Sequence, residues 1–243
     1  MPHTDCSACP LRAQPLFTPF TPAELAFMRR FKTGEVVVPR GAQVLNQGES
    51  SSRLFTVHSG MGTRSVLLED GRRQVINFVF PGDLLGLQAG LLGEAKHSVT
   101  AASPMVLCGF ARDGLWELFR NQPERAYDLT WIGAVEEHFL GETIASLGQR
   151  DAQERMAWAL LRIWRRLAAV GLAREGAVPL PFRQQELADA LGLSLVHTNK
   201  TVARLRRDGL AFWQDGQLSI PDKDALARVA GVQDQREDRR PIL

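Results

Sequence analysis

The residues of this chain best suited to chemistry are two cysteines near its beginning. Cys6 and Cys9 form a Cys-x-x-Cys pair, and Cys108 is the third cysteine of the 243-residue sequence. An odd number of cysteines does not make a disulfide framework, so in a reducing compartment the pair indicates a metal ion, a cluster or a redox-active dithiol. Cys108 lies in the apolar run Val106–Phe110, where a cysteine is more often a core residue. An inert role for all three cysteines is the remaining alternative.

The histidines do not gather into a comparable motif. They are scattered one by one along the chain, whereas an enzyme built on a cupin-like β-roll needs clustered metal ligands. The sequence also has no Gly-rich phosphate loop and no nucleophile motif. We therefore predict that the chain is not an enzyme. The five histidines are His3, His58, His97, His138 and His197.

Length and composition predict two small domains rather than one large core. Hydrophobic residues make up 44% of the chain and charged residues 23%, which is typical of a globular protein, and the net charge is only +2. Residues 1–12 contain no apolar run, and no stretch reaches the ~18 apolar residues that a membrane-spanning helix needs. We expect no signal peptide, no membrane segment and a cytoplasmic location.

Residues 34–110 have the pattern of a β domain, because short apolar runs alternate with Gly- and Pro-containing turns. Asp70-Gly71 between two such runs predicts a hairpin. A short helix that begins at Thr21-Pro22-Ala23-Glu24 precedes this region. The predicted strands are Val36–Val38, Val44–Leu45, Leu54–Val57, Ser65–Leu68, Val75–Val79, Val99–Ala101 and Val106–Phe110.

A long helix is predicted from Pro123 to about Leu147, after a short helix over Asp113–Arg120. One of its faces has residues spaced by four, three, four and three, which is the seam of a two-stranded coiled coil. The alternative is a helix that packs on its own domain. The seam residues are Gly133, Glu137, Leu140, Ile144 and Leu147.

Glu137 stands out on this seam because an apolar residue would pack better there. Our hypothesis is that Glu137 keeps the dimer weak enough for a signal to control it. The alternative is that the carboxylate points to solvent or pairs with an arginine.

Residues 183–210 carry the most specific pattern. A helix from Gln184 has Ala188 as a small residue that permits a close helix crossing, Gly192 provides a turn, and Ser194 caps a second helix. These offsets predict a helix-turn-helix. A hairpin with the turn Asp215-Gly216 follows the second helix, and a further helix over Asp151–Val170 precedes the pair. The helix-turn-helix and the hairpin together form a winged helix. A solvated basic helix in an ordinary helical domain is the alternative.

The exposed face of the second helix carries polar side chains at its start and basic ones further along, which suits DNA. We predict base contacts from His197, Thr198, Asn199 and Lys200. The full set of predicted DNA-contacting residues is Arg183, Gln184, Ser194, Val196, His197, Thr198, Asn199, Lys200 and Arg204.

A β-roll, a long helix and a winged helix, in this order, resemble the Crp/Fnr family over nearly the whole chain. The resemblance implies an α+β fold with a double-stranded β-helix (jelly-roll) sensor domain similar to cyclic-nucleotide-binding domains. It also implies a transcription regulator that binds a palindromic double-stranded DNA site as a homodimer and recruits or blocks RNA polymerase. The motifs that carry it are Gly34-Glu35, Gly41 through Gly48-Glu49, Leu54 through Gly60, Pro81 through Gly86, Glu186-Leu187-Ala188 and Leu191 through Ser194.

This resemblance implies five segments. They are a cysteine-containing segment (1–20), a sensor domain (21–120), a dimerisation helix (121–149), a winged-helix DNA-binding domain (150–232) and a flexible tail (233–243). Many family members carry Glu, Ser and Arg on the base-reading face of the recognition helix. The matching positions in this chain hold Val196, Asn199 and Lys200. Without that Glu, an acceptor for a cytosine amino group is lost, so we expect a different half-site.

The signal remains open between several chemistries. Cyclic-nucleotide-binding members use an Arg-Ser pair, and His97 stands where the arginine is needed, although Lys96 or His97 could substitute in part. Fnr-like members hold an iron–sulfur cluster on four cysteines, and Cys6, Cys9 and Cys108 match three of them.

Pro15 occupies the position of the fourth family cysteine. A fourth ligand could come from Asp5, His3 or an external group. The alternatives are a dithiol–disulfide switch between Cys6 and Cys9, a bound metal ion, or haem on His58 or His97. An iron–sulfur cluster or a dithiol–disulfide switch implies a response to oxygen, nitric oxide or redox state.

Overall fold

The computed structural model describes residues 4–233 and 239–243, and the chain divides into two compact units. The sensor unit contains residues 4–137 together with 239–243, and the second unit contains residues 138–233. In these described residues no helix is long and apolar enough to cross a membrane.

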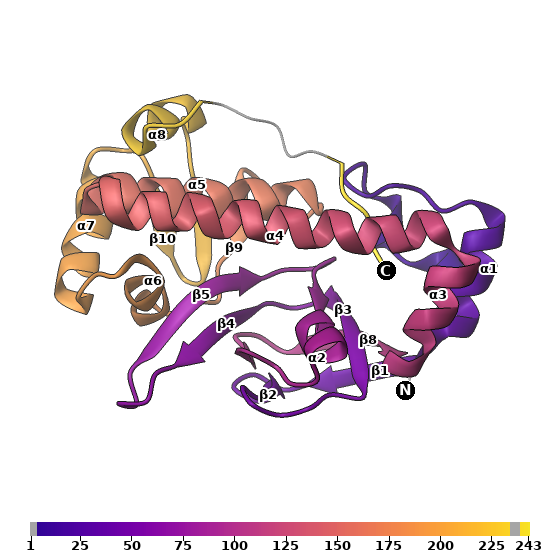
Figure 1. Cartoon of the computed structure of the whole chain (residues 1–243). Coiled ribbons are helices and arrows are strands. Elements are labelled where there is room, and N and C mark those ends of the chain that lie inside the picture. Colours follow the sequence, from indigo (N-terminus) through magenta and orange to yellow (C-terminus); the bar gives the residue numbers. More distant parts are fainter. Residues whose placement is uncertain (1–3, 234–238) are drawn as a thin grey trace. The chain divides into compact units, whose positions relative to one another are not determined.

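The sensor unit is built around two four-stranded antiparallel sheets (Figure 1). Each predicted apolar run lies in a strand except for Leu68, which follows the end of β4, and the Asp70-Gly71 turn joins β4 to β5, as predicted. One sheet has the order β1-β8-β3-β6, with β1 Lys32–Val38, β8 Met105–Ala111, β3 Arg53–Ser59 and β6 Leu84–Leu85. The other has the order β2-β7-β4-β5, with β2 Gln43–Leu45, β7 Ser98–Ala101, β4 Gly62–Leu67 and β5 Arg73–Val79.

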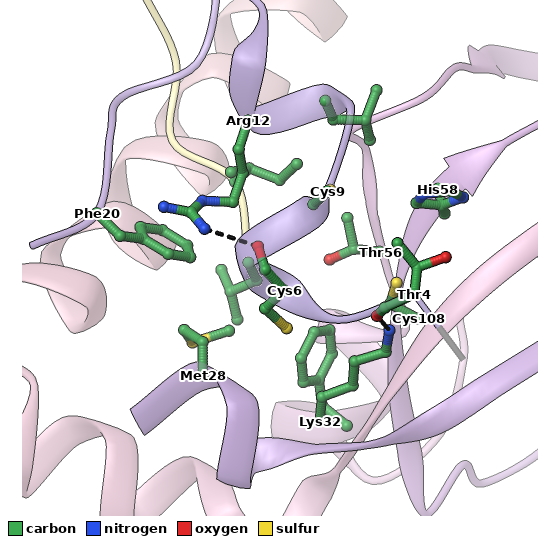
Figure 2. A pocket seen from close by; sticks show the side chains of 14 residues that line it. Thr4, Cys6, Cys9, Arg12, Phe20, Met28, Lys32, Thr56, His58 and Cys108 are labelled. Atoms are coloured by element: carbon green, nitrogen blue, oxygen red, sulfur yellow. Dashed lines mark hydrogen bonds between the residues drawn. The ribbon is translucent and has the colours of Figure 1, made fainter. Parts of the chain in front are cut away.

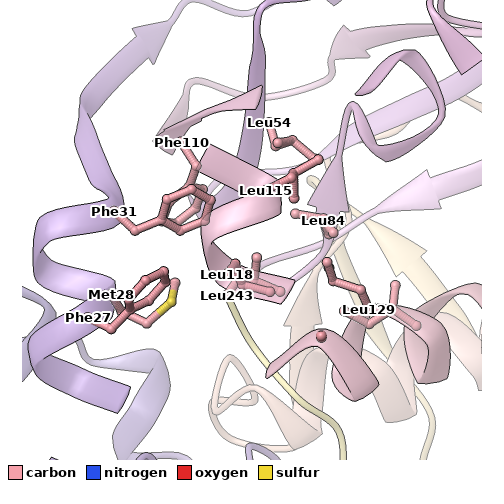
Figure 3. Close-up of a cluster of buried hydrophobic side chains, with 12 residues drawn as sticks. Phe27, Met28, Phe31, Leu54, Leu84, Phe110, Leu115, Leu118, Leu129 and Leu243 are labelled. Atoms are coloured by element: carbon pink, nitrogen blue, oxygen red, sulfur yellow. The ribbon is translucent and has the colours of Figure 1, made fainter. Parts of the chain in front are cut away.

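Two hydrophobic clusters hold the sensor unit together. The first involves inward-facing residues of both sheets, including Val57, Val99 and Leu107. The second joins the sheet containing β3 and β8 to α1 Pro22–Phe31, α3 Leu115–Asn121 and the start of the long helix (Figure 3). A short helix, α2 Leu87–Leu92, follows β6.

Helix α1 begins as the sequence predicts. The hydroxyl of Thr21 accepts a hydrogen bond from the backbone N–H of Glu24, and the carboxylate of Glu24 accepts one from the backbone N–H of Thr21. This capping box satisfies N–H groups that have no partner within the helix. Glu24 also forms a 3.0 Å ion pair with Arg125 at the start of the long helix.

The long helix, α4, runs over Pro123–Gln149. Four of the five predicted seam residues are exposed and Leu147 is half-buried. Leu140 is 43% exposed and Ile144 is 72% exposed, which leaves apolar surface available to a partner. The helix therefore does not bury this face against its own chain, and the dimer seam stays a prediction.

The second unit is a winged helix. Helix α5 Ala152–Ala169 is capped by Asp151 and packs against α7 Leu195–Arg207 and α8 Lys223–Ala230. Helix α6 Gln184–Leu191 ends at Gly192, whose φ of +63° lies in the left-handed region that favours glycine. A three-stranded antiparallel sheet of order β10-β11-β9 completes the unit, with β9 Ala177–Pro179, β10 Phe212–Gln214 and β11 Gln217–Ser219.

Two expectations about the ends of the chain need correction. The prolines at positions 2, 10, 15 and 19 predict an irregular segment before α1, but the structure has short 3-10 helices over Cys6–Ala8 and Leu11–Ala13. The end of the expected flexible tail is packed rather than free, because Ile242 and Leu243 are only 3% and 8% exposed. Residues 234–238 of that tail lie outside the described residues.

Candidate functional site

The three cysteines line one pocket of the sensor unit (Figure 2). Cys6 is the first residue of the first 3-10 helix, Cys9 follows that helix directly, and Cys108 comes from the middle of β8. The pairing of β8 with β3 places Cys108 opposite Thr56. Because side chains two positions apart in a strand share a face, His58 also lines this pocket.

Polar contacts hold residues 4–13, the N-terminal segment, over the pocket. The buried ammonium of Lys32 donates to the carbonyl of Thr4 at 2.7 Å and to the carboxylate of Glu35 at 2.7 Å. The same carboxylate accepts the backbone N–H of Thr4. Arg12 donates to the carbonyl of Cys6 at 2.6 Å, shown dashed in Figure 2. These bonds set where the two nearby thiols lie.

The thiols differ in acidity. Burial raises the pKa of Cys108 to about 11, and burial likewise raises the pKa of Cys6. Burial opposes ionisation of Cys9 as well, but the His58 side chain and the backbone N–H groups of Arg12 and Leu11 outweigh it, so the pKa of Cys9 is lowered. The same contact with Cys9 raises the pKa of His58. Cys9 is therefore the thiol most readily ionised.

The pocket offers a donor set but not a finished metal site. Three thiols and the His58 imidazole are ligand types that iron–sulfur clusters accept. His58 Nε2 is buried without a hydrogen-bond partner in the described structure. However, no three Cys, His, Asp or Glu side chains among residues 4–233 and 239–243 are arranged to hold a metal ion.

The pocket volume is about 30 Å³, room for roughly one or two waters. This volume is too small for an iron–sulfur cluster. Of the fourth ligands considered from sequence, Asp5 does not line the pocket. Its carboxylate caps the first 3-10 helix and pairs with Arg29. His3 lies outside the described residues.

His97 and Ser98 stand where cyclic-nucleotide-binding members of the family have their Arg-Ser pair, and His97 differs from that arginine in charge. His97 is 9% exposed, and burial, together with the positive charge of Arg64, lowers the pKa of His97 to about 4. Ser98 accepts a hydrogen bond from the backbone N–H of Gln47. Arg64 is engaged with the Glu136 carboxylate at 2.8 Å and with the Leu84 carbonyl. A neutral His97 cannot neutralise a cyclic phosphate.

Helix α7 presents the predicted DNA-contacting face of the second unit. Ser194 accepts a hydrogen bond from the backbone N–H of His197 and so caps the helix. The side chains predicted to contact DNA from this unit are exposed or half-exposed with one exception. The exposed or half-exposed ones are Arg183, Gln184, Ser194, Val196, His197, Asn199, Lys200 and Arg204.

Thr198 is the exception, and its predicted base contact is wrong. Its side chain is completely buried, and its hydroxyl has no hydrogen-bond partner within the described residues. Thr198, Thr201, Val202 and Leu205 follow the i, i+3, i+4, i+7 spacing of a buried helix face, and all four are buried. That periodicity could have excluded Thr198 from the sequence alone.

The sequence places Arg207 on the exposed face of this helix, but the predicted set of DNA-contacting residues does not cover the whole of this surface. An open groove of about 550 Å³ lies beside α7, between Gln184 and Asn199 on one hand and the wing residue Trp213 on the other. Arg206 and Arg207 line it as well. The groove joins predicted DNA contacts to two further cationic side chains, which suit phosphate groups.

Comparison with known proteins finds a matching domain family for each of the two units. A model of the cyclic nucleotide-binding domain matches residues 35–122, and a model of the Crp-like helix-turn-helix domain matches residues 154–229. The solved structure of FixK2 from Bradyrhizobium japonicum has the same fold, with a TM-score of 0.74 at 24% identity over 82% of this chain and 98% of that one.

A sensor β-roll followed by a winged helix defines a DNA-binding transcription regulator. The transcriptional activator protein FnrL of Cereibacter sphaeroides is 31% identical over 231 residues, 93% of this chain and 92% of that protein. The chain belongs to the Crp/Fnr family. The nitrogen fixation regulation protein FixK of Bradyrhizobium diazoefficiens is 29% identical over 93% of this chain and 94% of that protein. These relatives are regulators and not enzymes, as predicted.

Proposed function

We propose that this regulator binds a palindromic operator as a homodimer and that oxidation–reduction chemistry at its cysteine pocket controls the binding. The observation that carries the proposal is the convergence of Cys6, Cys9, Cys108 and His58 on one pocket of the sensor unit. Cys108 comes from a strand about a hundred residues away from the Cys-x-x-Cys pair. A signal acting on these thiols would change contacts between the N-terminal segment and the β-roll.

Features of the second unit and of α4 support the dimer and the operator. The exposed apolar side chains of Leu140 and Ile144 suit a parallel partner helix. Two copies related by a two-fold axis present two α7 helices to successive major grooves, roughly 34–36 Å apart, so the site must be palindromic. RNA polymerase is the expected partner at the promoter, and the naming of the FnrL relative as an activator favours activation.

Two chemistries at the pocket are consistent with this proposal. In the first, Cys6, Cys9 and Cys108 would hold an iron–sulfur cluster, with His58 as the fourth ligand. Such a cluster supplies reactivity toward oxygen or nitric oxide. In the second, a peroxide oxidises the thiols of Cys6 and Cys9 to a disulfide, and each hydrogen peroxide is reduced to two waters.

Control by a cyclic nucleotide is less well supported. The position that needs a permanent positive charge holds His97, which is buried and neutral at physiological pH. Arg64, the nearby cation, is already engaged by Glu136. We therefore place the signal at the cysteines.

The deciding experiment is anaerobic purification of the full chain followed by visible absorption, iron and sulfide analysis and operator binding. Bound iron and sulfide, lost in Cys9→Ser and kept in Ser7→Ala, support a cluster. Iron-free protein whose operator affinity changes when Cys6 and Cys9 form a disulfide supports the thiol chemistry. Ser7 is a suitable control because it lies between the two cysteines and is exposed. Iron-free protein with one operator affinity in reduced and oxidised buffer would contradict the proposal.

A further inference from the structure

The segment Arg239–Leu243 belongs to the sensor unit although it follows the DNA-binding unit in sequence. We call it the docking segment. Its backbone forms a parallel bridge with Phe17, in which the N–H of Arg240 donates to the carbonyl of Leu16 at 2.8 Å and the N–H of Thr18 donates to the carbonyl of Arg240 at 2.9 Å. The docking segment is therefore paired with residues 16–18, not merely laid on the surface.

Side chains anchor the docking segment at two further points. Arg240 forms an ion pair with Asp83 at 3.3 Å, and both side chains are largely buried, with 12% and 9% exposed. Leu243 joins the core cluster that includes Met28 and Leu118 (Figure 3). A charged anchor and an apolar anchor, joined by a short extended backbone, are the elements of a peptide-binding site.

The turn Pro81-Gly82-Asp83 contacts both Phe17 and Arg240, the two residues that form the parallel β-bridge. Gly82 has a φ of +87°, and a Cβ atom built on it would lie 2.3 Å from the ring of Phe17. A glycine is required here because the ring packs directly on the turn. The turn thus positions Phe17 through Gly82 and the docking segment through Asp83.

The docking segment also closes the cysteine pocket. Ile242 and Leu243 are among its lining residues, together with Cys6, Cys9 and Cys108. Residues 16–18, to which the docking segment pairs, follow the Cys-x-x-Cys pair within ten residues. Any movement of the N-terminal segment that accompanies chemistry at the cysteines would disturb this pairing.

We propose that the sensor unit has a binding site for the chain's own 239–243 segment, and that occupation of this site shields the cysteines. Chemistry at the cysteines displaces the segment from this site. The proposal deepens the proposed function, because the pocket concerned is the one to which the signal is assigned.

The test measures the rate at which a thiol reagent modifies Cys6 and Cys9 in the full reduced chain, with mass spectrometry to identify the sites. Arg240→Ala and Leu243→Ala should raise this rate about tenfold, since reaction follows the population of the open form. Arg239→Ala is the matched control, because it removes the same charge from an exposed neighbour. It should leave the rate unchanged.

A second arm separates binding from general destabilisation. An excess of the peptide Arg-Arg-Pro-Ile-Leu should return the rate of the Leu243→Ala variant toward that of the unmodified chain, and the scrambled peptide Leu-Pro-Arg-Ile-Arg should not. Equal rates in all variants, or faster rates that neither peptide reverses, would overturn the inference. The assay contains no DNA, so its failure is distinct from failure of the proposed function.

Discussion

Acidification is expected to destabilise the sensor unit through His97. In the unfolded chain this imidazole takes up a proton near its ordinary pKa of 6.5, whereas burial and the charge of Arg64 lower the pKa of His97 in the folded chain to about 4. The unfolded state therefore binds more protons between these values, and stability falls as the pH falls from 6.5 toward 4. Linkage gives a loss of about 2–3 kcal/mol between pH 7.5 and pH 4.5.

The assay is urea unfolding at both pH values, compared between the unmodified chain and His97→Gln. Glutamine does not titrate, so the variant lacks the contribution of His97 to the pH dependence of stability. The carboxylates contribute equally to both proteins. The unmodified chain should lose about 2–3 kcal/mol more than the variant on acidification. His138→Gln is the control, because His138 has a side chain that is 77% exposed. The same pH dependence in all three proteins would refute the burial of a neutral His97.

Substitutions at four further residues test the DNA-binding unit and the dimer. Asn199→Ala should reduce discrimination at one base pair by ~1–3 kcal/mol in a competition assay with operator variants, whereas Lys200→Ala tests whether that residue contacts phosphate, in which case all sites weaken alike. Glu137→Leu should strengthen dimerisation in sedimentation equilibrium, and an unchanged constant would remove Glu137 from the seam. Ser194→Ala should lower the free energy of unfolding by about 1 kcal/mol through loss of the helix cap, and Ser194→Asp should restore it.

The elements that depend on local pattern could be predicted from the sequence. The capping box at Thr21, the hairpin turn at Asp70-Gly71 and the cap at Ser194 are set by neighbouring residues, and all three are present. Strand β6 was not predicted, because Leu84–Leu85 is too short to give an alternating pattern. Its pairing with β3 is a long-range contact.

The cysteine pocket could be predicted only in part. Spacing and resemblance brought the three cysteines together as a set, but His58 joins them through the register of β3 against β8. That register depends on packing across the whole sheet and not on nearby residues. The docking of Ile242 and Leu243 was missed for the same reason, because the charged residues just before them suggest a free tail.

The most direct test of the account is the affinity of the full chain for its selected palindromic operator, measured by fluorescence anisotropy under reducing and oxidising conditions at one salt concentration. The account predicts strong binding in one state, weak binding in the other, and loss of this difference in Cys9→Ser but not in Ser7→Ala. Equal affinity in both states, or a difference that survives Cys9→Ser, would contradict control by the cysteine pocket.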